Sequence, residues 1–169
     1  MSLSMYQATV PPYIKALTNI KNFLQKAATH AKDKKIEESV LLQSRLYPDM
    51  FPLVMQVQIA SDIARATAAR LAGQEPPAYE DKEKTFGELY ERLDRTLDFL
   101  RGLQPEQFEG AANRAITRPL RGEPHTFTGI NYLQQFGIPN VYFHAATAYG
   151  ILRHNGVELG KADFLGKLD

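Results

Sequence analysis

Hydrophobic residues recur in the N-terminal segment at alternating spacings of four and three, which is the period of an α-helix with one buried stripe. Pro11 and Pro12 predict a first turn or a kink in this helix, because proline lacks the amide hydrogen that a helix interior uses. The chain therefore begins with a predicted long amphipathic helix. Its stripe consists of Tyr13, Leu17, Ile20, Leu24 and Ala27.

Two further runs have the same period and predict a second and a third helix. Asp49 is the expected N-cap of the second helix, and Gly73 is expected just beyond its end. The third helix opens with Thr85 and Glu88, spaced as in a capping box, and closes at Gly102. The two stripes are Leu53, Val57, Ala60, Ala64, Thr67 and Leu71, and then Leu89, Leu93, Leu97 and Leu100.

The segment 113–128 breaks the helical pattern, and its brief alternation predicts a short hairpin or an irregular crossover. A short helix is expected over 130–136, and a long one from Ile138 to the C-cap signal at Asn155-Gly156. The tail 157–169 is expected to be a surface extension. The pattern thus predicts an all-α four-helix bundle in one domain, 1–169, with a crossover or short hairpin between helices three and four.

The composition of the chain excludes several classes of function and makes others unexpected. The chain has 20 Lys and Arg residues against 19 Asp and Glu residues, and a formal net charge of +1, which gives no reason to expect nucleic acid or an anionic membrane as partner. The absence of cysteine excludes disulfides, thiolate metal sites and cysteine nucleophiles. The start of the chain lacks the pattern of a signal peptide, so a cytoplasmic location is expected. The charged stretch 75–98 predicts a solvated face around the third helix.

Polar residues inside predicted helices are the candidates for chemistry. His144 lies in an apolar part of the last helix, and Asn140, four residues earlier, shares its face. His144 is either a metal ligand or acid–base group, or a buried histidine hydrogen-bonded by its neighbours. On the second helix, Gln58 is a candidate if packing places it opposite His144. Asp62, on the same face as Gln58, either joins that site or forms an exposed surface pair with Arg65.

A family resemblance rests on three segments, RLYPDMFPL at 45–53, TGINYLQQF at 128–136 and PNVYFHAATAYGILRHNG at 139–156. They resemble an uncharacterised bacterial and fungal domain family, which is similar to the DinB/YfiT-like superfamily of four-helix bundles. The closer resemblance covers nearly the whole chain. It implies a DinB/YfiT-like bundle, and members of that superfamily often form homodimers.

The superfamily resemblance also implies a metal site, with one histidine on the second helix and two, four residues apart, on the last helix. When the endings of the last helix are aligned, His144 occupies the second histidine position of that pair and Asn140 the first. The ligand position on the second helix falls near Gln56 or Gln58. Neutral amides are weak ligands for nickel and zinc. We therefore expect a degenerate site, with no cofactor and no tightly bound metal.

Three functions remain open. The leading interpretation is an uncharacterised DinB-like bundle that binds a small molecule in the former metal cleft through His144, Asn140 and Gln58. The first alternative is an enzyme of the superfamily type, a metal-dependent thiol transferase or hydrolase in which His144 holds nickel or zinc together with Asp62 or Gln58. The second alternative is a structural or stress-associated homodimer whose surface is the functional part.

Overall fold

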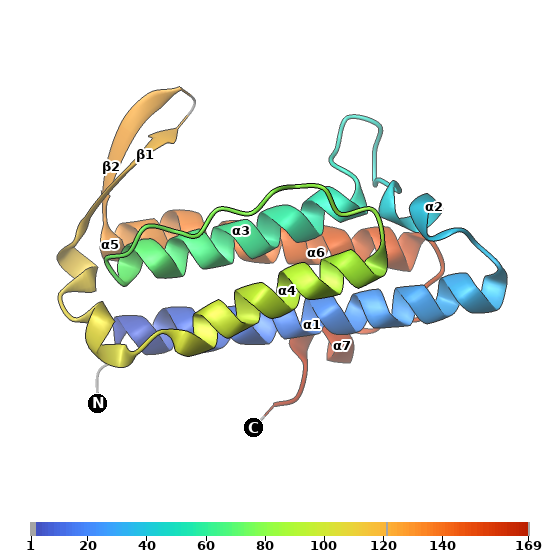
Figure 1. Cartoon of the computed structure of the whole chain (residues 1–169), viewed down its shortest axis with the longest axis horizontal. Helices are drawn as coiled ribbons and strands as arrows, with labels where there is room; N and C mark the ends of the chain where they lie inside the picture. Colours follow the sequence, from blue (N-terminus) through green and yellow to red (C-terminus); the bar gives the residue numbers. More distant parts are fainter. Residues whose placement is uncertain (1–2, 121, 169) are drawn as a thin grey trace.

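Four long helices form the body of the protein in a computed structural model that describes residues 3–120 and 122–168 (Figure 1). In this arrangement α1 packs against α4 and α6, and α3 packs against the same two helices from the opposite corner. The predominantly helical fold that the periodicity predicts is confirmed. The bounds of these helices are Met5–Lys34 for α1, Leu53–Leu71 for α3, Phe86–Gly102 for α4 and Ile138–His154 for α6.

The two helices α3 and α4 run in the same direction, each from the end of the bundle near α2 to the end that carries the hairpin (Figure 1). Parallel neighbours need a connection as long as the bundle, and residues 73–85 provide it by running along α3 and α4 (Figure 1). We call residues 73–85 the strap. The lengthwise crossover therefore lies between α3 and α4, the second and third long helices.

Local capping determines where the helices begin and end. The Ser4 hydroxyl accepts a hydrogen bond from the backbone N–H of Gln7, and the side-chain oxygen of Gln7 accepts one from the backbone N–H of Ser4. This capping box starts α1 at Met5. Of the two alternatives predicted for Pro11 and Pro12, a first turn or a kink, the first was wrong, since both prolines lie inside α1. The predicted capping box of α4 is present, with the Thr85 hydroxyl accepting the Glu88 amide.

Of the two predictions for the ends of α3, the N-cap was wrong and the glycine beyond the C-terminal end was correct. Its N-cap is Pro52 rather than Asp49, because the turn before it is closed by the Leu53 amide donating to the Ser44 carbonyl. Gly73 follows the helix with a positive φ of 75°, a left-handed conformation that glycine adopts without steric cost. The short helix α2, Glu38–Leu42, precedes this turn and buries Leu41 and Leu42.

A two-stranded antiparallel hairpin connects α4 to the last long helix and projects from one end of the bundle (Figure 1). Its strands pair with Ala115 opposite Thr128 and Leu120 opposite Glu123, and most of their residues are exposed. The connecting elements are the 3₁₀ turns Pro105–Phe108 and Ala111–Asn113, the strands β1 Ala115–Leu120 and β2 Glu123–Thr128, the helix α5 Gly129–Asn131 and the π-helix Tyr132–Gly137.

The C-terminal tail is part of the fold, which corrects the expectation of a surface extension. Val157 and Leu159 are buried, and a short helix, α7 (Lys161–Leu165), packs on α1. The ring of Phe164 lies between those of Phe23 and Tyr149, with centroid distances of 6.2 and 6.0 Å. This aromatic contact holds α7 on the bundle, although α7 is too short to show helical periodicity in the sequence.

None of the helices in the described residues combines the length and the apolar character that a membrane span requires.

Candidate functional site

The ring of His144, on α6, points toward α3. The residue is buried, with an exposed fraction of 8%. Its Nδ1 is 2.7 Å from Oε1 of Gln56. The amide of Gln56 is itself oriented, because its Nε2 donates to the Phe51 carbonyl at 2.9 Å. The amide oxygen must therefore face the imidazole, and Nδ1 must carry the proton in that hydrogen bond.

This hydrogen bond leaves the other ring nitrogen as an acceptor. Burial lowers the pKa of His144 below its ordinary value, so the ring is neutral at pH 7. In the neutral Nδ1–H tautomer, Nε2 keeps its lone pair, and it makes no hydrogen bond with any residue that the structure describes. His144 thus presents one oriented acceptor nitrogen, held by Gln56 in the way that a metal-binding histidine is held by a carbonyl.

The other predicted site residues do not join His144. The Asn140 amide donates to the Phe136 carbonyl one turn back in its own helix, at 2.7 Å. Gln58 donates to Glu83 on the strap at 2.8 Å, so helix packing does not place it opposite His144, which was the condition for its candidacy. Residues two apart on a helix point about 200° away from each other, and therefore Gln56 faces α6 while Gln58 faces away from it.

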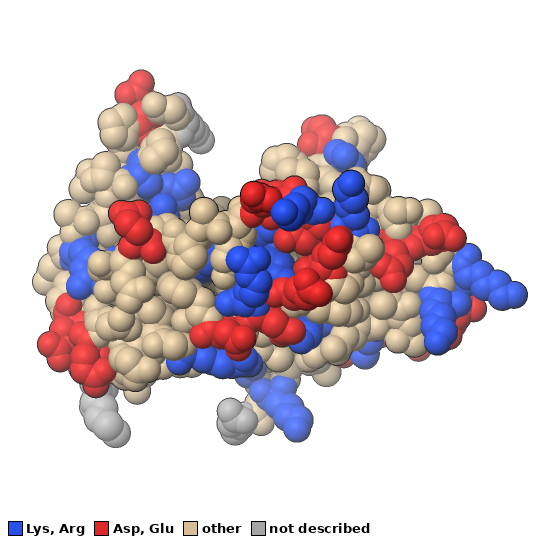
Figure 2. Space-filling view, viewed as in Figure 1, with Lys and Arg blue, Asp and Glu red and all other residues tan. Residues whose placement is uncertain are grey.

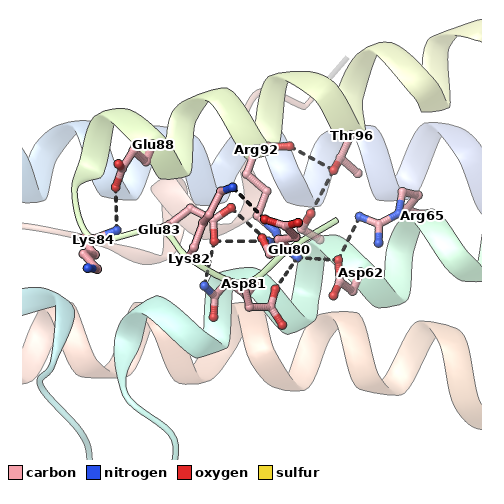
Figure 3. A network of polar contacts seen from close by, with 12 residues as sticks. Asp62, Arg65, Glu80, Asp81, Lys82, Glu83, Lys84, Glu88, Arg92 and Thr96 are labelled. Atoms are coloured by element: carbon pink, nitrogen blue, oxygen red, sulfur yellow. Dashed lines mark hydrogen bonds and ion pairs between the residues drawn. The ribbon is translucent and has the colours of Figure 1, made fainter. Parts of the chain in front are cut away.

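Asp62 belongs to a second polar centre, the Arg92 cluster, which consists of Asp62, Arg65, Asp81, Glu83 and Arg92 (Figure 3). The Arg92 side chain is only 1% exposed and lies 2.6 Å from Asp62, 2.8 Å from Asp81 and 2.9 Å from Glu83. The cluster therefore joins α3, α4 and the strap around one buried guanidinium. Asp62 and Arg65 are not the exposed surface pair, because the Arg65 side chain is buried.

The strap adds an aromatic contact to this cluster. Tyr79 lies beneath the guanidinium of Arg65 at 3.7 Å and that of Arg95 at 4.1 Å. Acidic and basic side chains lie side by side over this part of the surface (Figure 2). The stretch 75–98 is thus partly a solvated face, as predicted, and partly a buried ion-pair network. The burial of Arg92 could not be predicted from the sequence, because the pattern around a lone arginine in a charged stretch is the same whether it is buried or exposed.

Known proteins resemble this chain over nearly its whole length. The family model described as "Domain of unknown function (DUF1993)" matches residues 5–165. The chain belongs to the DUF1993 family. The crystal structure of a DinB family member protein from Shewanella denitrificans is 44% identical to this DUF1993 chain. It matches with a TM-score of 0.92 and covers 97% of this chain and 93% of its own. No curated protein matches. The resemblance to an uncharacterised DinB-like family is therefore confirmed.

The side chains at the ligand positions implied for this DUF1993 protein do not fit a tightly bound transition metal. Asn140 and Gln58 use their amides elsewhere, and Gln56 bonds to the imidazole itself. Among residues 3–120 and 122–168, no three His, Asp or Glu side chains gather in a group that could hold a metal ion. His144 therefore offers one imidazole nitrogen, whereas nickel and zinc sites of proteins combine three or more strong donors.

Proposed function

We propose that this DUF1993 protein binds a small molecule at His144, whose Nε2 accepts a hydrogen bond from the ligand. The observation that carries the proposal is the chain of hydrogen bonds from the Phe51 carbonyl through Gln56 to Nδ1 of His144. This chain fixes both the tautomer and the orientation of a buried ring. Holding an acceptor in one direction is what a binding site for a neutral hydroxyl or N–H group requires.

An exposed aromatic side chain beside His144 indicates the rest of the ligand. The Phe143 ring packs edge-on against the imidazole at 5.2 Å and is 57% exposed. An exposed apolar side chain in contact with a buried polar group is typical of a binding surface. The expected ligand is therefore a neutral molecule with one hydrogen-bond donor and an apolar body.

A fragment screen followed by protein NMR tests the proposal. Neutral aryl alcohols and aryl amides should shift the resonances of His144, Gln56 and Phe143. The variant His144→Phe keeps the volume of the ring but removes the acceptor, and it should bind these fragments at least tenfold more weakly. His154→Gln is the matched control, because His154 is exposed near the end of the same helix. Equal binding by His144→Phe, or fragments that shift only distant residues, would contradict the proposal.

The enzymatic alternative uses the same nitrogen. A neutral Nε2 can act as a general base, so thiol transfer or hydrolysis at His144 stays a second proposal for this DinB-like fold. Assays with low-molecular-weight thiols and electrophilic acceptors, with and without nickel or zinc, test it. Turnover that is lost in His144→Phe and kept in His154→Gln would favour an enzyme over a binding protein.

The homodimer prediction has an observation of its own in its favour. The outward face of α6 carries Pro139, Tyr142, Phe143 and Ala146, which are all exposed and none of which is charged. An apolar face on the outer side of a bundle helix is typical of a surface that a second subunit covers. Light scattering should give a dimer for the wild type and a monomer for Ala146→Arg. A monomeric wild type at 100 µM, roughly, would contradict homodimer formation.

A further inference from the structure

A concave site lies on another side of α6 from His144, between α1, α6 and the C-terminal segment. Its volume is about 190 Å³, and its walls are mainly apolar. Phe23 and Phe164, stacked at an interplanar angle of 18°, form one part of the wall, and Leu168 forms another. Ala16 and Ala145 leave the space open, because larger side chains at these positions of the two helices would fill it.

The polar groups that line this pocket include a cation, an amide and a hydroxyl. The Lys15 side chain contributes a positive charge, and Tyr142 contributes a hydroxyl. Asn19, which is buried, uses one amide hydrogen to bind the Phe164 carbonyl at 2.8 Å and has a second one left. Among the described residues that line the pocket there is no Asp or Glu. The site therefore combines an apolar body with cationic and donor groups, which is complementary to an anion attached to an apolar group.

The volume limits the size of the ligand. An enclosed apolar cavity of about 150 Å³ accommodates a benzene molecule. A pocket of about 190 Å³ thus has room for one aromatic ring with a short side arm. The stacked aromatic wall favours a ring over an alkyl chain, since offset rings attract each other beyond the area that they bury.

We propose that this pocket binds a monocyclic aromatic carboxylate, with the ring against Phe23 and Phe164 and the carboxylate near Lys15. The site is separate from His144, which faces α3 instead. Because α7 supplies part of the wall, the ligand contacts both the bundle and the C-terminal segment. Binding should therefore stabilise the docked position of α7, which the bundle also holds through the 2.8 Å ion pair between Lys26 and Asp163.

Calorimetric titration with 3-phenylpropanoate and with its neutral amide tests the proposal. The carboxylate should bind at least tenfold more tightly than the amide, and amide hydrogens of α7 should exchange more slowly in its presence. Ala145→Leu should abolish binding because it fills the pocket. Lys15→Met should weaken binding by about fivefold, the size of one partly solvated charge contact.

Two control variants distinguish binding in this pocket from binding elsewhere on the protein. Lys32→Met removes an exposed α1 lysine outside the pocket and should bind the carboxylate like the wild type. His144→Phe should also bind it like the wild type, so a failure here is distinct from a failure at His144. Equal affinity for carboxylate and amide, equal affinity of Lys15→Met and Lys32→Met, or no binding at all would overturn the proposal. Because Lys15 is exposed, its variant remains a valid test even if Ala145→Leu fails to fold.

Discussion

Replacing Arg92 by methionine is the most informative perturbation of stability. The substitution keeps an apolar stem of similar length and removes the guanidinium at the centre of the Arg92 cluster. It leaves Asp62 with Arg65 as its remaining ion-pair partner, and Glu83 with the hydrogen bond from Gln58. It also removes the hydrogen bond at 3.2 Å from Arg92 to the Glu80 carbonyl, one of the contacts that hold the strap on the bundle.

The expected loss of stability in Arg92→Met depends on how deeply each ion-pair partner of Arg92 is buried. Breaking a fully buried ion pair costs about 3–5 kcal/mol, because it leaves a charge buried without a partner. Here the Asp81 side chain is 58% exposed and returns to water at little cost, while the Glu83 side chain is 11% exposed and does not. Discounted for this exposure, the expected loss is about 2–3 kcal/mol. In a domain of this size that corresponds to a decrease in Tm of about 5–10 °C.

Urea denaturation at pH 7, with thermal unfolding as a second measurement, checks this value. Arg101→Met is the matched control, because the Arg101–Asp98 pair is exposed on both sides and should contribute at most about 0.5 kcal/mol. A loss below about 1 kcal/mol in Arg92→Met, or one equal to that of the control, would refute the view that this guanidinium holds the strap.

Acid titration adds a second readout for the same cluster. Partial burial raises the pKa of Glu83, but hydrogen bonds from Gln58 and Arg92 outweigh it and leave the pKa below its ordinary value. A carboxylate of this kind contributes stability above its unfolded pKa and loses it as the pH falls through the folded pKa. The wild type should therefore lose more stability in acid than Arg92→Met does. Parallel pH profiles would contradict the assignment.

Three further predictions concern other parts of the molecule. A Cβ at Gly137 would lie 2.5 Å from the Tyr13 hydroxyl and 2.6 Å from Thr67 Cγ2, so Gly137→Ala should cost about 2 kcal/mol in urea denaturation, whereas Gly102→Ala, with nothing within 4 Å, should not destabilise. Thr85→Ala should cost about 1 kcal/mol by removing a helix cap, and an unchanged midpoint would contradict that role. Because burial lowers the pKa of His144, stability should fall as the pH drops below about 6.5, with a smaller slope in His144→Phe.

The long helices and the capping box of α4 could be predicted from the sequence because their signals are local. The stripe from Leu53 to Leu71 and the pair Thr85–Glu88 determine their elements through neighbours three or four residues away. The start of α1 was not predicted. Its capping box pairs Ser4 with Gln7, whereas the stronger local signal, the proline pair, lies further along the helix.

Contacts between helices could not be predicted in the same way. Gln56 and Gln58 are chemically identical, and only the choice of the α3 face that packs on α6 decides which one meets His144. Burial of Arg92 depends on the strap folding back over it, which no local pattern shows. The docking of Phe164 similarly depends on a groove made by Phe23 and Tyr149, residues distant in sequence.

We infer that Gln56 holds His144 as a neutral imidazole with a free Nε2 that does not bind zinc tightly. Proton–nitrogen correlation spectra of the histidine rings at pH 7, recorded before and after one equivalent of zinc, test this inference. We expect a ring protonated on Nδ1, with an Nε2 resonance that zinc at this concentration leaves in place. A ring protonated on Nε2, a charged imidazolium, or an Nε2 resonance displaced in full by equimolar zinc would contradict it.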